Sequence, residues 1–525
     1  MTRAVLPPYR SRHLGVALAA LWTVLALTLA GCDATPVATD DPEPTRDVTP
    51  RATPPTPSTP QGLQQFYGQE ISWESCDEDF DCGEVEVPLD YADPEGEAIE
   101  IALKSLPAGD DDERLGSLVI NPGGPGVSGI EYVEQAEAQF GDDVLDHYDV
   151  VGFDPRGVAA SSPVDCLSDD QLDEFIGADP APDDAEETED LLAQTENFGQ
   201  GCVELSGNVA AHVSTTEVAR DLDLIRAALG EPRLDYFGAS YGTLLGATYA
   251  ELFPDNVGRM VLDGAVDPSL SAKQAALDQA AGFQRAAEAY LANCVDEEED
   301  CPLGDTVEEA EQNLRQFLAD LDAQPIAGDA ERELTQGRAI LGVWLPLYVE
   351  ELWPVLDQAL TAAIDEGDGS LLLRLADFYV SREESGYANN SIEALYAINC
   401  LDHSTEGSVV EVRASIPEFE RVSPIFGEVF AWGALGCGDW PVEAAEPVPS
   451  IDAAGADPIV VVGTTRDPAT PYEWAVAMAE QLESGVLVSR EGDGHTGYGR
   501  GNECVDSAVE DYLLDGTVPR DGLEC

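Results

Sequence analysis

Short apolar runs, each followed by a loop rich in glycine or aspartate, recur along the chain and alternate with stretches of helical spacing. The clearest runs are GSLVIN at 116–121, YDVVGF at 148–153, LDYFGA at 234–239 and IVVVG at 459–463. Apolar strands that alternate with helices are typical of a parallel sheet covered on both faces. We therefore expect an α/β fold with a mostly parallel sheet, whose functional residues follow the carboxyl ends of strands.

The pattern becomes helical in the middle of the chain, where no strong strand series is found. Helical spacing covers 271–294, 306–324, 345–367 and 391–403. A helical block inserted into an α/β sheet is typical of a cap over an active site. We expect a core at 64–267 and 449–525, with a helical cap at 268–448.

The amino-terminal segment has the pattern of an export signal. Three arginines precede an uncharged apolar run at 14–30, and the run ends in LAGC at 29–32, which resembles a bacterial lipobox. We expect a lipoprotein signal peptide at 1–31 and a lipid on Cys32 that anchors the protein at the extracellular side of the membrane. An uncleaved anchor and a plain secreted product are the alternatives. Residues 32–63 are rich in Pro, Thr and Asp and are predicted to be a disordered tether.

The ten cysteines other than Cys32 fall in near neighbours along the chain. Since disulfides persist in exported proteins, five local bridges are expected, although sequence alone does not fix their connectivity. The neighbours are Cys76 and Cys82, Cys166 and Cys202, Cys294 and Cys301, Cys400 and Cys437, and Cys504 and Cys525. No CxxC pair with a matching partner pair is present, so we expect no metal.

The formal net charge of -78 excludes one large class of partners. A surface this negative repels phosphate backbones, so we expect no nucleic acid among the partners. The acidity favours solubility, and any steering that it exerts favours cationic ligands. The free ammonium end of a peptide is one such ligand.

A serine lies at a predicted turn from a strand to a helix. Gly238, Ser240 and Gly242 match GxSxG, the pattern of a nucleophile elbow. The serine adopts a strained backbone there, so its neighbours must be small. We expect Ser240 to be a catalytic nucleophile.

A serine hydroxyl needs a base, and a histidine held by a carboxylate is the usual one. Of the five histidines, His403 and His495 follow Ser240. His495 lies in a glycine-rich loop just after a strand, whereas His403 ends a helical stretch and is expected to be structural. Asp467 directly follows an apolar strand, unlike Asp452 and Asp457, which precede it. We predict Ser240, Asp467 and His495 to be the catalytic triad.

The developing oxyanion needs hydrogen-bond donors, which backbone N–H groups supply. Tyr241 follows the nucleophile, and NPGGPG at 121–126 follows an early strand. We predict an oxyanion hole made by the N–H groups of Tyr241 and Gly124, with Gly123 the next candidate. A phosphate loop is excluded because no lysine follows these glycines.

Five motifs in one order carry a family resemblance. They are NPGGPGVSG at 121–129, FDPRG at 153–157, GASYGT at 238–243, TTRDPATP at 464–471 and GDGHTGYG at 492–499. From about residue 64 onward the chain resembles the secreted tripeptidyl aminopeptidase branch of the proline iminopeptidase-like α/β-hydrolases. The resemblance implies an α/β-hydrolase fold and release of short peptides from free amino termini, or ester hydrolysis as in some members.

An aminopeptidase also binds the substrate ammonium, for which a cap carboxylate is suited. Glu350, Glu351, Glu393 and Asp402 are the candidates, and the family-like motif AINCLD at 397–402 favours Asp402. We expect an extracellular serine exopeptidase that acts on peptides and needs no cofactor. A carboxylesterase with the same triad is the alternative, and an inactive binding lipoprotein is a third hypothesis. The sequence indicates no oligomeric state.

Overall fold

The computed structural model describes residues 62–77, 79–110, 112–297, 301–403, 407–438, 440–442 and 448–525. The expected signal peptide, the lipidation site at Cys32 and nearly all of the tether lie outside these residues. In the part of the chain that is described, no helix is both long and apolar enough to cross a membrane.

The described residues form a ten-stranded sheet in the order β1-β2-β3-β5-β4-β6-β7-β12-β13-β14. β1, β2, β3 and β5 pair in antiparallel fashion, and every pairing from β5 through β4 to β14 is parallel. The strands are β1 (Glu74–Ser75), β2 (Asp81–Pro88), β3 (Ala98–Leu106), β4 (Gly116–Asn121), β5 (Tyr148–Phe153), β6 (Leu234–Ala239), β7 (Val257–Asp263), β12 (Ile459–Arg466), β13 (Gly485–Asp493) and β14 (Leu523–Glu524). The mostly parallel α/β sheet expected from the apolar runs is confirmed.

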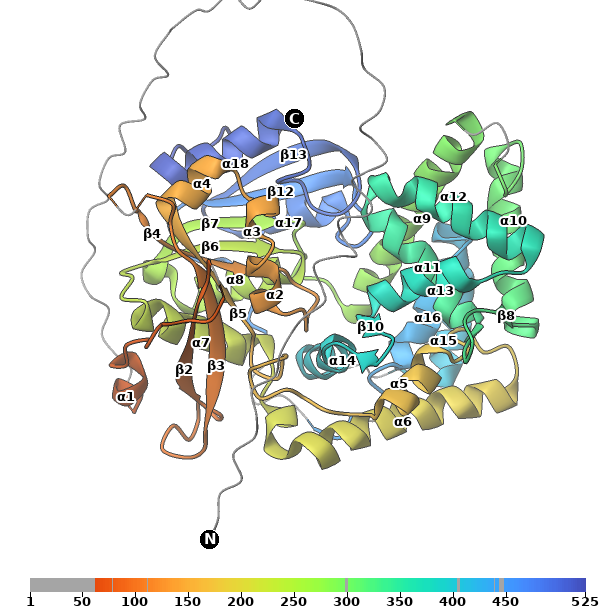
Figure 1. Cartoon of the computed structure of the whole chain (residues 1–525), viewed down its shortest axis with the longest axis horizontal. Coiled ribbons are helices and arrows are strands. Elements are labelled where there is room, and N and C mark those ends of the chain that lie inside the picture. Colours follow the sequence, from red (N-terminus) through yellow and green to blue (C-terminus); the bar gives the residue numbers. More distant parts are fainter. Residues whose placement is uncertain are drawn as a thin grey trace, which may run out of the picture. The chain divides into compact units, whose positions relative to one another are not determined.

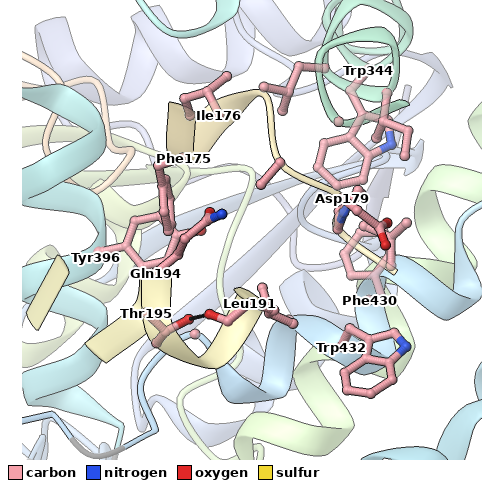
Figure 2. Close-up of a pocket in the computed structure, with 18 of the residues that line it drawn as sticks. Phe175, Ile176, Asp179, Leu191, Gln194, Thr195, Trp344, Tyr396, Phe430 and Trp432 are labelled. Atoms are coloured by element: carbon pink, nitrogen blue, oxygen red, sulfur yellow. Dashed lines mark hydrogen bonds between the residues drawn. The ribbon is translucent and has the colours of Figure 1, made fainter. Parts of the chain in front are cut away.

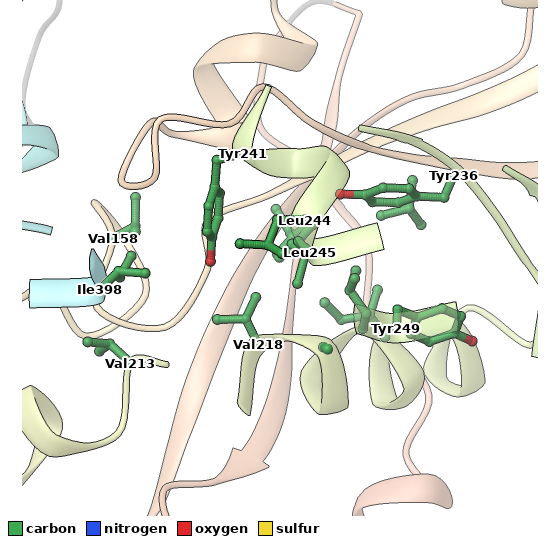
Figure 3. Packing of buried hydrophobic residues seen from close by; sticks show 14 of the residues in the cluster. Val158, Val213, Val218, Tyr236, Tyr241, Leu244, Leu245, Tyr249 and Ile398 are labelled. Carbon is green, nitrogen blue, oxygen red and sulfur yellow. The ribbon is translucent and has the colours of Figure 1, made fainter. Parts of the chain in front are cut away.

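Helices cover both faces of this sheet, because the central strands are apolar on both sides. In β4, Leu118 and Ile120 belong to one buried cluster and Val119 to the other. The first cluster includes residues of α2, α4 and α18, and the second includes residues of α7, α8 and α17. Figure 3 shows part of the second cluster, with Leu244 of α8 lying over Val218 of α7. The helices are α1 (Gln64–Tyr67), α2 (Gly129–Val133), α3 (Ala136–Gln139), α4 (Asp142–His147), α5 (Asp169–Ile176), α6 (Ala185–Ser206), α7 (Thr215–Ala228), α8 (Tyr241–Leu252), α17 (Tyr472–Gln481) and α18 (Glu503–Asp515).

Between β7 and β12 the chain is almost wholly helical, and α9 to α13 gather in one group (Figure 1). These helices have a buried cluster of their own, which contains Tyr290, Leu314 and Leu356. Two short hairpins, β8 (Ile326–Ala327) with β9 (Glu333–Leu334) and β10 (Arg382–Glu383) with β11 (Gly386–Tyr387), interrupt them. The helices are α9 (Ala272–Glu297), α10 (Val307–Ala323), α11 (Gln336–Tyr348), α12 (Trp353–Thr361), α13 (Ser370–Tyr379), α14 (Ser391–Asp402), α15 (Val409–Val422) and α16 (Gly427–Trp432).

The helix expected at 345–367 is divided in the structure. α11 ends at Tyr348, and α12 begins at Trp353 with Pro354 in its first turn. Proline lacks an N–H and disfavours helical backbone at the residue before it, so a long helix does not run through this point. The last carbonyl groups of α11 are therefore free to bind partners outside the helix.

Two helices that precede β6 in sequence contact the helical block. Arg382 pairs with Asp173 of α5 at 2.6 Å, and the Arg413 guanidinium donates to Thr188 Oγ1 of α6 at 2.9 Å. The described residues also contain all five local disulfides that the cysteine spacing predicts, 76–82, 166–202, 294–301, 400–437 and 504–525. The bridge between Cys166 and Cys202 joins the segment before α5 to α6.

Candidate active site

Ser240 lies at the sharp turn between β6 and α8. Its φ of 56° is in the left-handed region, and its N–H donates to the carbonyl of Asp263 at 2.8 Å. A Cβ added to Gly238 would meet the Gly242 carbonyl oxygen at 2.3 Å, and one on Gly242 would meet the Asn121 carbonyl oxygen at 2.7 Å. Glycine is thus sterically required on both sides of the serine, as the GxSxG pattern predicts.

The NPGGPG loop after β4 packs directly against this turn. A Cβ on Gly123 would lie 2.9 Å from both Ser240 Cβ and Tyr241 N. The Gly123 N–H donates to the Asn121 side chain at 3.0 Å, and Tyr241 is the first residue of α8. The first N–H groups of a helix have no partner within it, so the Tyr241 N–H is available to a ligand.

His495 and Asp467 are brought together by the ends of β13 and β12. His495 Nδ1 lies 2.9 Å from both carboxylate oxygens of Asp467. Asp467 is fully buried and also accepts from the N–H groups of Ala469, Thr470 and Thr496. So many donors hold the carboxylate in one orientation, which fixes the imidazole ring beside it.

Asp263, at the end of β7, joins the serine turn to the histidine loop. Its backbone carbonyl accepts from Ser240, and its buried carboxylate accepts from the N–H groups of Gly497 and Tyr498 at 2.8 and 2.9 Å. Burial raises the pKa of the Asp263 carboxyl to about 6. Within the described residues no hydrogen bond joins Ser240 to His495 directly, but a Cβ on the next residue, Gly264, would lie 3.3 Å from His495 Cε1. Ser240 follows β6 and His495 follows the end of β13, so the two side chains come from the same edge of the sheet but from strands that β7 and β12 separate.

The break after α11 supplies a further contact to the histidine. The backbone N–H of His495 donates to the backbone carbonyl of Tyr348 at 3.0 Å. The two side-chain rings pack edge to face, with 5.3 Å between their centroids. The Tyr348 hydroxyl lies 3.5 Å from that of Tyr379. The helical block thus contacts, through Tyr348, the edge of the sheet that carries the predicted triad.

Asp402 is hydrogen-bonded to Thr215, the first residue of α7. Its carboxylate accepts from the Thr215 N–H at 3.0 Å and from the Thr215 hydroxyl at 2.6 Å. The Thr215 Oγ1 is also 2.5 Å from the hydroxyl of Tyr241, the residue that follows the serine. Burial raises the pKa of the Asp402 carboxyl to about 7, against the lowering effect of the bonds from Thr215. Its predicted role as the amine anchor stays a prediction.

The other predicted anchors differ in accessibility. Glu393 is buried and accepts from the N–H groups of Cys166 and Leu167 at 2.6 and 2.9 Å. Glu350 and Glu351 are exposed in the turn between α11 and α12. Glu393 therefore ties α14 to the segment before α5, and only Glu350 and Glu351 present their carboxylates to solvent.

Comparisons with known proteins agree with this arrangement. A family model described as "TAP-like protein" matches residues 423–525, and one described as "alpha/beta hydrolase fold" matches residues 116–330. The chain is 39% identical over 479 residues to Serine protease Hip1 of Mycobacterium tuberculosis. The match covers 87% of this chain and 91% of that protein. Carboxylesterase B of the same organism is 36% identical over 472 residues, covering 86% and 89%. Tripeptidyl aminopeptidase of Streptomyces lividans is 32% identical over 468 residues, covering 87% and 86%.

The chain belongs to the TAP-like α/β-hydrolase family. It is a serine hydrolase, as the resemblance of its motifs implies.

Three residues of this TAP-like hydrolase that contact the site were not anticipated from its sequence. Thr470 donates to Asp467 at 3.0 Å, Asp263 holds the loop after His495, and Tyr348 packs on the His495 ring. Asp263 and Thr470 carry a signal in the sequence, because Asp263 ends β7 and Thr470 follows β12 at the edge of the sheet where the predicted triad lies. Tyr348 carries none, since its contact depends on where the helical block packs.

Carboxylates that come close enough together to hold an ion are found elsewhere in the TAP-like hydrolase. Among the described residues they are Asp179, Glu187 and Asp322 in one group and Asp183, Asp184 and Glu187 in another. The first group is half-buried and the second is mostly exposed, and exposed acidic groups are common in a chain with 103 acidic residues. Neither group includes a residue of the predicted triad.

Proposed function

We propose that this TAP-like hydrolase is an extracellular serine exopeptidase that releases tripeptides from the free amino termini of peptides through an acyl-enzyme intermediate. The observation that carries the proposal is the pair of His495 and Asp467 at 2.9 Å, set beside the strained Ser240 turn. The likeness to a tripeptidyl aminopeptidase supports the choice of bond.

Ser240, His495 and Asp467 perform acyl transfer in two halves. His495 Nε2 takes the proton of the Ser240 hydroxyl as its oxygen bonds to the scissile carbonyl carbon. The tetrahedral intermediate collapses when the C–N bond breaks, and the imidazolium gives its proton to the leaving amine. Water then attacks the acyl-enzyme by the same route and releases the short peptide. Asp467, which binds Nδ1, stabilises the imidazolium in both halves.

The oxyanion of each tetrahedral intermediate binds the N–H groups of Tyr241 and Gly124. Gly123 is less suited, because its N–H already donates to the Asn121 side chain. Each donor of this kind is worth about 3–4 kcal/mol of transition-state stabilisation. Gly123 contributes through its missing side chain, which lets the loop approach Tyr241 N.

The location outside the cytoplasm is part of the proposal. Five disulfides among the described residues favour an oxidising compartment. The apolar run and LAGC at the amino terminus support lipidation at Cys32 and attachment to the membrane. Metabolic labelling with a fatty acid, compared between the wild type and Cys32→Ala, tests this attachment, and equal labelling would contradict it.

A carboxylesterase is the second candidate, favoured by the likeness to carboxylesterase B. The two activities share the triad and differ in the group that leaves the acyl carbon. A tripeptide arylamide with a free amino terminus, its acetylated form and a short acyl ester separate them. We expect turnover to fall sharply on acetylation, and a preference for the ester with indifference to acetylation would contradict the exopeptidase.

Replacing Ser240 by Ala tests the nucleophile itself. We expect kcat to fall on the order of 10⁶-fold, as when the nucleophile of another serine protease is removed. A fluorophosphonate probe should label the wild type and not Ser240→Ala. Thr243→Ser, which keeps a hydroxyl one turn away on α8, controls for folding. Persistent labelling of Ser240→Ala would refute the assignment.

A further inference from the structure

A cavity of about 410 Å³ lies between the helical block and helices α5 and α6. Its walls are largely aromatic and aliphatic, and Figure 2 shows Trp344, Phe430 and Trp432 on one side with Phe175 and Tyr396 on the other. Concave, mostly apolar sites with a few polar groups are the usual binding sites for small ligands and peptide ends. The polar groups therefore decide what this cavity binds.

Two side-chain oxygens in the cavity wall have no partner. Within the described residues, Asp179 Oδ2 and Gln194 Oε1 are buried and make no hydrogen bond. The other oxygen of Asp179 accepts from the Ala181 N–H at 2.8 Å, which fixes the carboxylate in the loop between α5 and α6. A buried acceptor without a donor is costly, so each oxygen is a place for a ligand's N–H group.

The charge around Asp179 selects a cation. Burial, together with the nearby carboxylates of Asp322, Glu187 and Asp183, raises the pKa of the Asp179 carboxyl to about 6. A positive group beside Asp179 relieves both effects, whereas the carboxylate end of a peptide would add to the repulsion. Figure 2 shows Asp179 beside Trp344 and Phe430, whose ring faces also attract cations.

A chain of contacts connects the cavity wall to the catalytic histidine. Trp344 packs on Phe283 at 4.8 Å between centroids, Phe283 on Tyr348 at 5.7 Å, and Tyr348 on His495 at 5.3 Å. On a second path, Gln279 in the wall donates to the carbonyl of Ala469 at 2.9 Å, two residues after Asp467. Packed side chains therefore connect the cavity wall to the loops that carry His495 and Asp467.

The length of α11 gives the scale of the separation. Gly337 and Trp344 line the cavity, and Tyr348 ends the same helix against His495. At 1.5 Å per residue, the lining spans about 6 to 16 Å from Tyr348 along the helix axis. Three extended peptide residues cover about 10 Å. The length of three peptide residues is thus comparable with the separation of the cavity lining from Tyr348 along α11.

We propose that this cavity receives the amino-terminal residue of the peptide substrate, with the α-ammonium bound by Asp179 and Gln194 and its apolar side chain against the aromatic wall. The inference rests on the proposed exopeptidase function and moves the amine anchor from Asp402 to Asp179. A metal ion held by Asp179, Glu187 and Asp322 is the competing occupant, because their carboxylate oxygens are suitable ligands, and treatment with a chelator tests it.

The test compares Asp179→Asn with the wild type on the free tripeptide arylamide, its acetylated form and the acyl ester. We expect KM for the free peptide to rise about 10- to 100-fold, since a hydrogen-bonded charge pair is lost. Turnover of the acetylated peptide and of the ester should stay unchanged, which also shows that the variant folds. Asp170→Asn is the matched control, because it removes the same charge from an exposed position on α5, outside the carboxylates that surround Asp179.

The outcomes separate the anchor from the function. A wild type that prefers the free peptide, together with an Asp179→Asn that has lost this preference, supports the anchor. If Asp179→Asn keeps the wild-type preference, or if a chelator abolishes the difference between the two proteins, the anchor is refuted and the exopeptidase stands. If the wild type itself ignores acetylation, the exopeptidase and the anchor both fail.

Discussion

The sheet edge that carries the predicted triad and the cavity between the helical block and helices α5 and α6 differ in how completely their carboxylates are hydrogen-bonded. Both oxygens of Asp467 accept bonds from N–H or hydroxyl donors as well as from His495. In the cavity, by contrast, Asp179 Oδ2, Gln194 Oε1 and Trp344 Nε1 find no partner among the described residues. The sheet edge is complete before any ligand arrives, and the cavity is completed by one.

The difference fits the roles that we propose for the two regions. A triad must hold its geometry through two proton transfers, so dipoles fixed in advance reduce the reorganisation at each step. A binding cavity gains affinity from groups that the ligand satisfies, and each unpaired buried group costs the free protein about 1–3 kcal/mol. The free energy gained by burying the apolar clusters on both faces of the sheet offsets this cost.

Asp467→Asn is expected to cause a large loss of activity, because it disrupts the hydrogen bonds at the sheet edge. The amide nitrogen would face the N–H donors that now surround the carboxylate, and it would bind the wrong tautomer of His495. We expect kcat to fall about 10⁴-fold, the loss seen when another serine protease carries this change. Steady-state kinetics on the tripeptide arylamide measures it.

Asp452→Asn is the control for this change. Asp452 lies before β12 and is exposed, so its substitution should leave kcat unchanged. A loss below tenfold in Asp467→Asn would mean that this carboxylate does not orient the base.

Gly123→Ala is expected to have the next largest effect, since it breaks the approach of the loop to the serine turn. Its φ is 96°, and the new Cβ would lie 2.5 Å from the Ala239 carbonyl oxygen and 2.9 Å from Tyr241 N. The loop must move away, and the loss of one oxyanion donor lowers kcat about 10²- to 10³-fold.

Gly230→Ala provides the matched comparison. Gly230 also has a positive φ, 78°, but a Cβ there would meet nothing within 4 Å. Both variants place an alanine at a positive φ, so kcat and unfolding temperature measured on the two separate the cost of that backbone conformation from the loss of the donor. Equal kcat in the two variants would contradict the oxyanion role of the loop.

The sheet edge was largely predictable from the sequence because its information is local. An apolar run and the loop after it indicate where a strand ends, and the carboxyl ends of parallel strands lie at one edge of the sheet. Ser240, Asp467 and His495 were named on that basis, and the strands that carry them lie where the runs predict. The disulfides were predictable for a similar reason, since the paired cysteines are near neighbours.

The cavity was not predictable, because its wall combines segments far apart in sequence. Asp179 belongs to the loop between α5 and α6, in the segment assigned to the core, while Trp344 and Phe430 belong to the helical block. Nothing local distinguishes Asp179 from the 102 other acidic residues of the chain. The break at Val349 was missed too, although Pro354 offered a signal for it.

Asp402→Asn is expected to have the smallest effect. Asp402 shares one property with each of the two regions. Its carboxylate binds Thr215 as a well-satisfied group does, yet burial raises its pKa to about 7. The unfolded chain releases this proton near the ordinary value of about 4. The folded protein therefore holds more protons than the unfolded one between about pH 4 and 7, and the wild type loses stability as the pH rises through this range.

The asparagine variant does not titrate and keeps an oxygen for the Thr215 N–H, while the Thr215 hydroxyl can donate or accept. We expect the two proteins to be nearly equal in stability at pH 4 and the variant to be more stable by on the order of 1–2 kcal/mol at pH 8, after a discount for partial exposure. Urea unfolding of the wild type and of Asp402→Asn at both pH values measures the difference. If Asp402→Asn were instead less stable at pH 8, the bonds from Thr215 would outweigh burial, and Asp402 would belong with Asp467 among the fully compensated carboxylates.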